Sequence, residues 1–596
     1  MQTFTTDVLV VGAGPAGLTA AAFLAQAGIP AITLSRYSGT APQPRASFTN
    51  QRTMEVFRDL GIEDEIQRVA TPGLTIGHNV MATTLTGQEI LRVQTYGTGD
   101  RLVDYASASP SESYNAPQHV MEPVLLKTAL DRGADVRFMH EMLTIEQTDS
   151  EVIARILNRT TNEEYMVRAK YAIGADGGRS RVAEQVGIPF DGEAALMHMV
   201  NAWIECDLSE HTAYRPAGIY MMLQPGGGSW VGSGSFVSVR KWDDWVLVRE
   251  YDASQGEPDT SDEAVIEATR ALVGDPNIPV KVKGTSKWQV NNMVAKEYRR
   301  GRVFIAGDAA HRHSPAGGLG SNTSIQDSYN LAWKLAYVLK GKAGEGLLDS
   351  YHQERQPVGK QIVDRAMANL HNKSALGEVL GLKRGQSAEE GWASIRSLFS
   401  DEPGSAERRK ALSAVRALQH YRSNAHGVFL GQRYTSCAIV DDGTPFPAPT
   451  RDPEVYYHPT THPGAYLPHA WLERDRQRIS TLDLAGHGRF CLIVGIGGAP
   501  WAEAAASVSA EFGIELPVFA VGWRCKYDDV VGDWDRVREI DDRGALLVRP
   551  DRHIAWRSLT RPASPRDALA DAVRQALVLG TGRSIATAGE REQRYA

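Results

Sequence analysis

A glycine-rich loop between a short apolar strand and a helix is the feature that most constrains the fold of this chain. Residues 7–11 form an aspartate followed by a β-branched apolar run, a helix is expected over residues 18–27, and a second strand over residues 29–34. Such a run, bounded by glycine, is typical of a buried parallel strand. The loop between strand and helix consists of Gly12, Ala13, Gly14, Pro15, Ala16 and Gly17.

The glycine spacing has a physical purpose. Gly12 allows a tight turn, Gly14 lets the backbone approach a pyrophosphate, and Gly17 lets helix and strand pack closely. The phosphates then lie at the positive end of the helix. We therefore predict a βαβ unit that binds a dinucleotide. The second strand ends in Ser35-Arg36 where such units usually offer an acidic residue to the ribose, so Arg36 is expected to contact the adenosine or its phosphates instead.

Two further glycine–acid signatures follow much later in the chain. A strand at 170–173 leads to Gly174, Ala175, Asp176 and Gly177, and a strand at 302–306 leads to Gly307-Asp308. A glycine-rich stretch at 314–322 comes next, and then a helix with one apolar face formed by Ile325, Tyr329, Ala332, Leu335 and Leu339. A further helix is expected over 348–357, closed by Pro357.

Composition narrows the class of protein. The chain has 596 residues, 42% of them hydrophobic and 23% charged, and a formal net charge of −7. These values are typical of a soluble globular protein and argue against nucleic acid or a membrane as partner. Four cysteines without a C-x-x-C pair favour a reducing, cytoplasmic location. The basic cluster Arg408-Arg409-Lys410 is interpreted as a solvated helix face.

The three signatures together resemble the single-component flavin aromatic hydroxylases, class A of the flavoprotein monooxygenases. The match consists of residues 12–17, Asp176-Gly177 with Ser180, and Gly307-Asp308. The C-terminal third looks like the thioredoxin-like extension of the phenol hydroxylase branch, on Pro463-Gly464 and residues 544–551. Within that branch, Pro44-Arg45, residues 50–55, His311-Arg312-His313 and residues 318–327 are similar to the chlorophenol and hydroxybiphenyl monooxygenases.

The resemblance implies an α/β architecture with a Rossmann-like FAD-binding domain, an inserted β-sheet substrate domain and a C-terminal thioredoxin-like domain. The expected boundaries are 1–75 with 101–190 and 300–365 for FAD, 76–100 with 191–299 for the substrate sheet, 366–470 for a helical segment and linker, 471–585 for the thioredoxin-like domain, and 586–596 for a loose tail. The linker reading rests on the Pro-, Thr- and His-rich stretch at 445–468.

The resemblance also implies a reaction. NADH or NADPH reduces FAD, O2 is trapped as a flavin C4a-hydroperoxide, and one oxygen is transferred to a ring carbon ortho or para to a phenolic hydroxyl. No metal is required, because the flavin carries the oxygen activation. The H-x-H spacing of His311 and His313 is accordingly read as part of the motif and not as a metal site. A small phenolic substrate and a homodimer are expected.

The family's cofactor contacts carry over residue by residue. The loop 12–17 would hold the pyrophosphate, with Ser35 and Arg36 near the adenosine. Asp308 would contact the ribityl chain or ribose, and the amides of Ser321 and Asn322 would face the flavin N1–O2 edge. Asp176-Gly177 would serve both FAD and the nicotinamide cofactor. The remaining positions assigned to the cofactor are Arg45, Gln118, Ala175, Gly307, Pro315, Gly318 and Gly320.

The residues expected around the substrate differ from those of the chlorophenol-type relatives. The position that often carries a candidate base is Ser47, and a serine hydroxyl is no base near neutral pH without help. We therefore expect either a more acidic or activated substrate, or a base recruited from elsewhere, such as His313. The Pro315 carbonyl is expected near the substrate hydroxyl. The expected substrate contacts are Asn115, Met221 or Met222, Trp288 and Pro315.

Two alternatives stay open at this point. The same chemistry could act on a larger biosynthetic aromatic such as a polyketide, because Ser47 and the methionine pair leave room for one. A flavin-binding protein that has lost turnover is the other reading, motivated by Ser35, Ser47 and by Ala183, which replaces an arginine of the nicotinamide motif. The intact segment 308–322 argues against it.

Overall fold

The computed structural model describes residues 1–226, 233–383 and 385–580; the expected tail at 586–596 lies outside these ranges. The chain divides into two compact units. The first consists of Met1–Tyr329, Gln356–Leu430 and Thr450–Tyr457, and the second of Asn330–Arg355, Gly431–Pro449 and the chain from His458. No helix in the described ranges combines the length and the apolarity of a membrane span.

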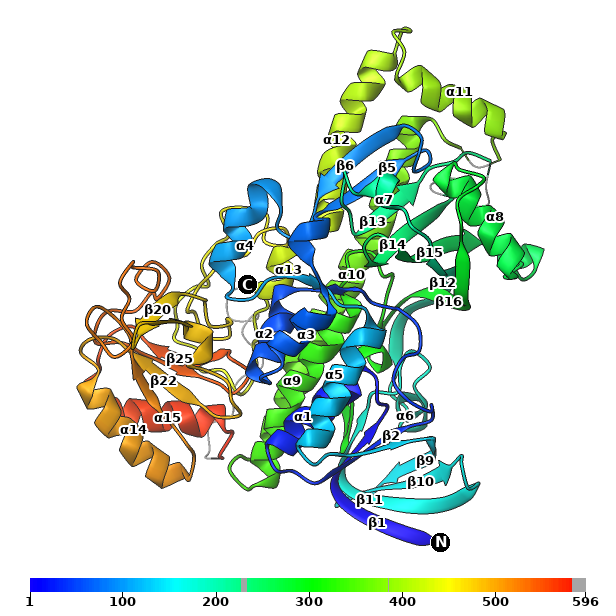
Figure 1. Ribbon diagram of the computed structural model, residues 1–596. Helices are drawn as coiled ribbons and strands as arrows, with labels where there is room; N and C mark the ends of the chain where they lie inside the picture. The colour runs from blue at the N-terminus through cyan, green and yellow to red at the C-terminus, as the bar shows by residue number, and fades with distance from the viewer. Residues whose placement is uncertain (227–232, 384, 581–596) are drawn as a thin grey trace, which may run out of the picture. The chain divides into compact units, whose positions relative to one another are not determined.

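The first unit is built on a mostly parallel sheet in the order β17-β18-β11-β1-β2-β8, which β10 and β9 extend beside β11 (Figure 1). Val8, Leu9 and Val10 are fully buried in β1, as the apolar run predicts. The predicted βαβ unit is confirmed, since β2 pairs with β1 in parallel. The strands are β1 (Gln2–Val11), β2 (Ala31–Ser35), β8 (Asp135–Phe138), β9 (His140–Gln147), β10 (Val152–Asn158), β11 (Glu163–Gly174), β17 (Arg299–Arg300) and β18 (Val303–Ile305).

Helices α1 (Pro15–Gln26), α2 (Gln51–Asp59), α5 (Gln118–Asp131) and α9 (Gly320–Leu339) share one apolar core of the first unit. Leu18, Phe57, Leu125 and Ile325, one from each helix, are buried there. Shorter elements connect these helices: β3 (Phe48–Thr49), α3 (Glu63–Val69), β4 (Thr71–Pro72), α4 (Leu102–Ala108), β7 (Tyr114–Asn115) and α6 (Arg181–Gln185).

The inserted sheet predicted for the substrate domain is present, in the order β19-β16-β12-β15-β14-β13-β5-β6. Helix α8 (Asp262–Val273) covers one face, where Leu272 joins a core with Tyr220, Phe236 and Leu247. The opposite face carries half-buried side chains such as Ile219, Val237, Val248 and Asn201. The strands are β5 (His78–Ala82), β6 (Glu89–Gln94), β12 (Phe190–Glu205), β13 (Ile219–Met222), β14 (Gly234–Arg240), β15 (Asp244–Tyr251), β16 (Lys281–Ala295) and β19 (His311–Arg312), with α7 (Ser209–Thr212) after β12.

Helix α10 (Asp349–Leu380) does not end at Pro357, so the expected helix end there is wrong. A proline removes a single intrahelical hydrogen bond. The residues that follow it, including Val358, Ile362 and Ala366, are buried, and their packing keeps the helix continuous. Further along, the apolar faces of α10, α11 (Ala388–Leu398) and α12 (Ser405–Ser423) pack on β5, β6 and β13. The short α13 (His426–Leu430) follows.

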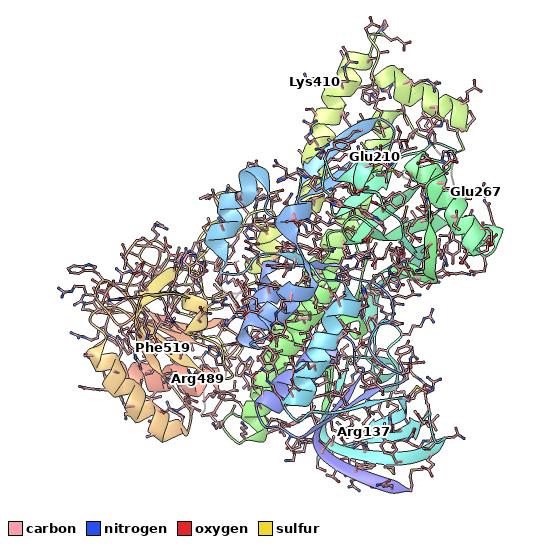
Figure 2. The ribbon with its side chains drawn as sticks, in the orientation of Figure 1. Arg137, Glu210, Glu267, Lys410, Arg489 and Phe519 are labelled. Atoms are coloured by element: carbon pink, nitrogen blue, oxygen red, sulfur yellow. The ribbon has the colours of Figure 1, made fainter. Side chains whose placement is uncertain are left out.

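The basic cluster on α12 is only partly a solvated face. Lys410 points into solvent (Figure 2). Arg408 is half-buried and donates hydrogen bonds to the carbonyls of Val379 and Ser394, at 3.1 and 3.0 Å. The interpretation is therefore wrong for Arg408, which joins α10, α11 and α12.

Helix α9 differs from the expected helix with one apolar face, because every residue from Asn322 to Tyr337 is buried. Its polar residues have partners instead of solvent. In the first unit, Asp327 accepts a hydrogen bond from His311 at 2.8 Å, and Ser328 donates to the Ala16 carbonyl at 2.7 Å. In the second unit, Lys334 pairs with Glu354 at 2.7 Å. A helix that is buried on all sides can keep polar residues only by pairing them.

The second unit contains a four-stranded sheet, β23-β22-β24-β25, with β22 and β23 parallel and a hairpin of β24 and β25. The order along the chain is strand, helix, strand, hairpin and helix, and the term thioredoxin-like stays a prediction. The elements are β20 (Trp471–Arg474), β21 (Gln477–Ser480), β22 (Cys491–Val494), α14 (Ala499–Phe512), β23 (Val518–Ala520), β24 (Ala545–Val548), β25 (Ile554–Ser558) and α15 (Pro565–Ala576).

The expected linker at 445–468 is wrong in its second half, because residues 460–470 are all buried. His462 lies between two carbonyl oxygens, those of Thr444 at 3.0 Å and Pro463 at 2.9 Å. His469 is hydrogen-bonded to the Ser480 hydroxyl at 2.8 Å. This Pro- and His-rich segment therefore forms part of the core of the unit, because each of its imidazoles has a polar partner.

A buried charge cluster joins the separate chain segments of the second unit. Glu354 accepts hydrogen bonds from Lys334 at 2.7 Å, from Arg549 at 2.6 and 2.8 Å, and from Asn330 at 2.7 Å. Asp551 is the second anion, and it pairs with Arg549 at 2.5 Å. The two anions balance the two cations. Arg549 and Lys334 hold the pKa of Glu354 well below its ordinary value despite burial. The cluster thus ties the α9–α10 segment to the β-hairpin.

We expect Glu354→Gln to lower the free energy of unfolding by about 3–5 kcal/mol, because it leaves two buried cations with one anion. Urea denaturation followed by tryptophan fluorescence measures the loss. The matched control is Glu503→Gln on the exposed face of α14, which should stay within about 0.5 kcal/mol of the parent. Equal effects of the two substitutions would contradict the role given to the cluster.

Candidate functional site

The three glycine–acid signatures meet at one edge of the first sheet. Strands β1, β11 and β18 run parallel, so their carboxyl ends lie together. The Ala175 amide donates to the Val11 carbonyl at 2.8 Å, and the Ala306 amide to the Gly174 carbonyl at 2.9 Å. Segments separated by well over a hundred residues are thereby placed side by side.

The first loop has no room for side chains at two of its glycines. Gly12 has a φ of +112°, and a Cβ there would stand 2.1 Å from the Ala175 carbonyl oxygen. A Cβ on Gly17 would stand 1.8 Å from the Gly12 carbonyl oxygen. Helix α1 begins at Pro15, so its first turn presents amides without intrahelical acceptors at this edge. An anion fits such a helix end.

The second signature is organised by Asp176. Its carboxylate accepts hydrogen bonds from the Ser180 hydroxyl at 2.6 Å and from the Val182 amide at 3.1 Å, which fixes the turn into α6. Burial raises the pKa of Asp176. Arg312, from the third signature, donates to the Gly178 carbonyl at 2.6 Å, so the second and third signatures are in direct contact.

The third signature places Asp308 in a recess. The side chain stays solvent-accessible although protein surrounds it, and this desolvation raises its pKa, against the opposing effects of His311, Arg312 and Arg45. The predicted cofactor residue Arg45 therefore lies close enough to act on Asp308. Buried Asp327 fixes the turn behind it, because it accepts hydrogen bonds from the Gly307 amide at 3.0 Å and from His311 at 2.8 Å.

The glycine-rich stretch before α9 ends in a helix N-terminus. Gly317 and Gly318 both have positive φ values, +95° and +67°. The amides of Ser321 and Asn322 belong to the first helical turn and have no intrahelical acceptor. The Asn322 side chain accepts a hydrogen bond from the Asn50 amide at 2.9 Å and donates to the Phe48 carbonyl at 2.8 Å, which attaches residues 48–50 to this helix end.

Sequence analysis missed Glu122, which supports the predicted residues Gln118 and Arg45. Its buried carboxylate accepts hydrogen bonds from the Gln118 amide group at 2.6 Å and from the Ala41 amide at 2.5 Å. Gln118 in turn donates its main-chain amide to the Arg45 carbonyl at 2.8 Å. Burial raises the pKa of Glu122. Only the tertiary structure brings Ala41 to this carboxylate.

These residues fit FAD. The edge offers a glycine cradle without space for a Cβ, the N-termini of α1 and α9, and an accessible acid at Asp308. The expected adenosine contacts lie at the end of β2: Ser35 is buried and accepts a hydrogen bond from the Tyr37 amide at 3.3 Å, while Arg36 is exposed. The Arg36 guanidinium donates a hydrogen bond to the Tyr37 hydroxyl at 3.1 Å.

An aromatic group stands beside the glycine loop that precedes α9. Phe48 packs so closely on Gly318 that a Cβ there would stand 2.7 Å from its ring. The Phe48 ring centroid lies 4.6 Å from that of Tyr96 and 5.6 Å from that of Phe429. The Tyr96 hydroxyl lies 3.0 Å from the Cβ position of Gly218, which precedes β13 of the inserted sheet. Motif-based reasoning missed Tyr96 and Phe429, because neither belongs to a recognisable pattern.

The predicted substrate contacts lie on the inserted sheet or beside it, but on different faces. Pairing through β13, β14, β15, β12 and β16 places Met221 and Trp288 on the half-buried face, whereas Met222 lies under α8. Met221 packs with α10–α12. The Trp288 indole donates to Asn201 at 2.8 Å, and buried Asn115 donates to the Ser238 carbonyl at 2.9 Å. Met222 therefore lies on the opposite face of the sheet from Met221 and Trp288.

The predicted catalytic residues lie next to Phe48, at the start of α9 and in the loop before it. Ser47 directly precedes Phe48 and is half-buried, and its carbonyl accepts a hydrogen bond from the Ala116 amide at 2.7 Å. His313 lies over the start of α9, 3.6 Å from the Cβ position of Gly320, and burial lowers its pKa to about 4. The Pro315 carbonyl accepts a hydrogen bond from the Gly318 amide at 3.0 Å. In the described residues, no group of His, Cys, Asp and Glu side chains is arranged to hold a metal.

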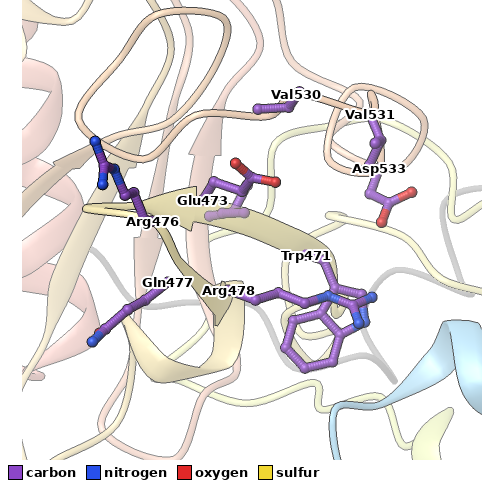
Figure 3. Close-up of a pocket in the computed structure, with 9 residues that line it drawn as sticks. Trp471, Glu473, Arg476, Gln477, Arg478, Val530, Val531 and Asp533 are labelled. Carbon is purple, nitrogen blue, oxygen red and sulfur yellow. The ribbon is translucent and has the colours of Figure 1, made fainter.

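A shallow cavity of about 460 Å³ lies elsewhere, in the second unit (Figure 3). It is lined by the β20–β21 hairpin and by residues 530–533, including Trp471, Glu473, Arg478 and Val531. None of the three signatures contributes to it. We therefore place the candidate site at the sheet edge and not in this cavity.

Comparisons with known proteins identify the family of this chain. The model of the family described as "FAD binding domain" matches residues 5–366, and that described as "Aromatic-ring hydroxylase, C-terminal" matches residues 460–578. The chain is 44% identical to 2,4-dichlorophenol 6-monooxygenase of Delftia acidovorans over 96% of this chain and 98% of the relative. It is 42% identical to phenol 2-monooxygenase of Pseudomonas sp. (strain EST1001) over 95% and 92%.

A solved structure is similar over nearly its whole length. The flavin-dependent monooxygenase PieE, in complex with FAD and substrate, superposes with a TM-score of 0.94 at 45% identity. The similarity covers 97% of this chain and 100% of that one.

We expect Gly17→Ala to abolish cofactor binding, because its Cβ would overlap the Gly12 carbonyl and displace the turn between β1 and α1. The ratio of flavin absorbance to protein in the purified variant measures the loss. Gly39→Ala is the matched control, since open space surrounds Gly39 and its φ is ordinary. Normal flavin content in Gly17→Ala would contradict the assignment of this loop.

Proposed function

Because the chain belongs to the family of FAD-binding aromatic-ring hydroxylases, we propose that it is an NAD(P)H-dependent monooxygenase that hydroxylates a phenolic ring ortho or para to an existing hydroxyl. The observation that carries the proposal is the convergence of the three signatures on one sheet edge beside Phe48, Tyr96 and Phe429. When bound, FAD would supply the group that NAD(P)H reduces and that activates O2.

The protein's part is to hold the cofactor and to exclude water. We assign the pyrophosphate to residues 12–17, the ribityl chain or ribose to Asp308, and the flavin N1–O2 edge to the amides of Ser321 and Asn322. The N-terminus of a 20-residue helix stabilises negative charge at that edge. Arg45 and Gln118 complete the cofactor contacts, with Glu122 as their support.

The substrate ring is proposed to bind against the aromatic group beside the glycine loop. Phe48 and Phe429 offer apolar surface, and Tyr96 offers a hydroxyl that stays protonated because burial raises its pKa. Ile219, on the half-buried sheet face, directly follows Gly218, which Tyr96 contacts, and Trp288 belongs to the same face four strands away. An aromatic substrate of small size gains affinity from such rings through burial and edge contacts.

Assembly and location are further parts of the proposal. We assign a homodimer, as the family resemblance implies, which sedimentation velocity tests directly. A cytoplasmic location is supported by the four cysteines, all of which are free thiols.

Substituted phenols should stimulate NADH or NADPH oxidation by the FAD-loaded protein and gain one oxygen atom. Mass spectrometry in ¹⁸O2 measures the incorporation, and a panel that includes larger fused aromatics tests substrate size. Incorporation into a fused aromatic alone would replace the phenolic substrate with the larger one. Stimulated oxidation without any labelled product from either class would contradict the hydroxylase assignment.

His313 should not act as the base that removes the phenolic proton. Its pKa of about 4 lies about 6 units below that of an ordinary phenol, so the transfer is uphill by about 8 kcal/mol. We expect His313→Gln to keep the shape of the kcat/KM profile between about pH 6 and 9. Loss of a limb of that profile in the variant would reinstate His313 as the base.

The same pKa shift has a consequence for stability. Between about pH 6.5 and 4 the unfolded chain binds a proton at this histidine and the folded chain does not, so stability falls as the pH falls. His313→Gln should weaken that dependence in thermal unfolding scans.

A further inference from the structure

Helix α5 begins beside the glycine loop of the first signature, with Gln118 at its first position and Glu122 one turn later. The Glu122 side chain is buried. A Cβ on Gly14 would stand 3.9 Å from its Oε1 atom, and the Gln118 Nε2 atom lies 2.6 Å from the same oxygen. The pair formed by Gln118 and Glu122 therefore borders the loop that we assign to the pyrophosphate.

The segment that carries Arg45 fixes the main chain around this pair. The main-chain amide of Gln118 donates to the Arg45 carbonyl at 2.8 Å. The Ala41 amide donates to the second carboxylate oxygen of Glu122 at 2.5 Å. With both segments held in this way, the direction in which the Gln118 side-chain amide is turned depends on what Glu122 offers to it.

Both oxygens of Glu122 accept hydrogen bonds, one from Gln118 and one from Ala41. Burial raises the pKa of Glu122, and these two donors together with the charge of Arg45 oppose that shift. An ionised carboxylate can only accept, so the Gln118 amide presents its NH2 group to Glu122 and its carbonyl oxygen away from it. In the part of the chain that the structure describes, this oxygen accepts no hydrogen bond, and Gln118 is half-buried.

We propose that Glu122 is a positioning residue for FAD, because it turns the Gln118 carbonyl oxygen toward the cofactor to accept a hydrogen bond there. This inference rests on the FAD site of the proposed function. A phosphate diester is ionised at neutral pH and has no hydrogen to donate, so the partner of Gln118 is a hydroxyl or N–H group of FAD. Arg45, whose charge acts on both Glu122 and Asp308, is the cation available to the anionic part.

Glu122→Gln separates this role from a purely structural one, because glutamine has nearly the same shape. The new carbonyl oxygen can still accept from Ala41, and the new NH2 group can donate to Gln118 once the Gln118 amide turns round. Both internal hydrogen bonds are then kept, but Gln118 presents N–H groups to the cofactor. The double variant Glu122→Gln, Gln118→Glu reverses the pair, so the carboxylate at position 118 accepts from position 122 and again offers an oxygen to FAD.

The test measures the affinity of the FAD-loaded protein for its cofactor. Serial dilution, with free FAD measured by fluorescence after ultrafiltration, gives the Kd. We expect Glu122→Gln to raise this Kd about fivefold to tenfold, the effect of one hydrogen bond, with an unchanged circular dichroism spectrum. The double variant should recover most of the affinity. Asp131→Asn makes the same change of acid to amide at the exposed end of α5 and should match the parent.

An unchanged Kd in Glu122→Gln overturns the inference. A weakened variant that the double variant does not restore also overturns it, since Glu122 would then act only through the fold. If Glu122→Gln loses its flavin during purification, restored flavin content in the double variant is the expected result. FAD binding is measured without turnover, so a protein that passes this test and oxygenates no phenol supports the role of Glu122 and rejects the proposed function.

Discussion

Parallel pairing of β1 with β11, and of β11 with β18, is the constraint on which the rest of the site depends. It delivers three loops from distant parts of the sequence to one sheet edge, where the carboxyl ends of parallel strands meet. The contact with Ala175 is so close that Gly12 has no space for a Cβ, and Gly17 has none because the Gly12 carbonyl lies against it. Gly12 is therefore a requirement of the strand pairing, and Gly17 of the turn into α1, as much as of the ligand.

Helix α9 contributes buried, paired polar residues to both units. Asp327 fixes the Gly307 turn and His311, and Asn322 attaches the strand that holds Phe48. In the second unit Lys334 belongs to the charge cluster around Glu354. A buried polar side chain without its partner is costly, so one helix fixes several loops at once.

The sequence predicted what depends on local pattern. The βαβ unit and the three signatures follow from apolar runs and glycine spacing, the inserted sheet follows from the family resemblance, and the structure has all of them. Prediction failed where tertiary packing overrides local preference. Pro357 does not end α10, because buried residues continue beyond it, and the histidine-rich stretch at 460–470 is core, because each imidazole has a partner. Tyr96 and Glu122 carry no local signal at all, since only the fold brings their neighbours together.

The two residues expected to remove the phenolic proton are poor bases. The serine at 47 is a neutral hydroxyl, and burial makes His313 a weak base. Electrostatics offers another route: a unit positive charge 4 Å from a phenolate contributes about 4 kcal/mol at an effective dielectric constant near 20. That equals about 3 pKa units, enough to bring an ordinary phenol from about 10 to about 7. A fixed positive charge near the bound oxygen would therefore ionise the phenol without a base of matched pKa, which is the requirement that Ser47 and His313 leave open.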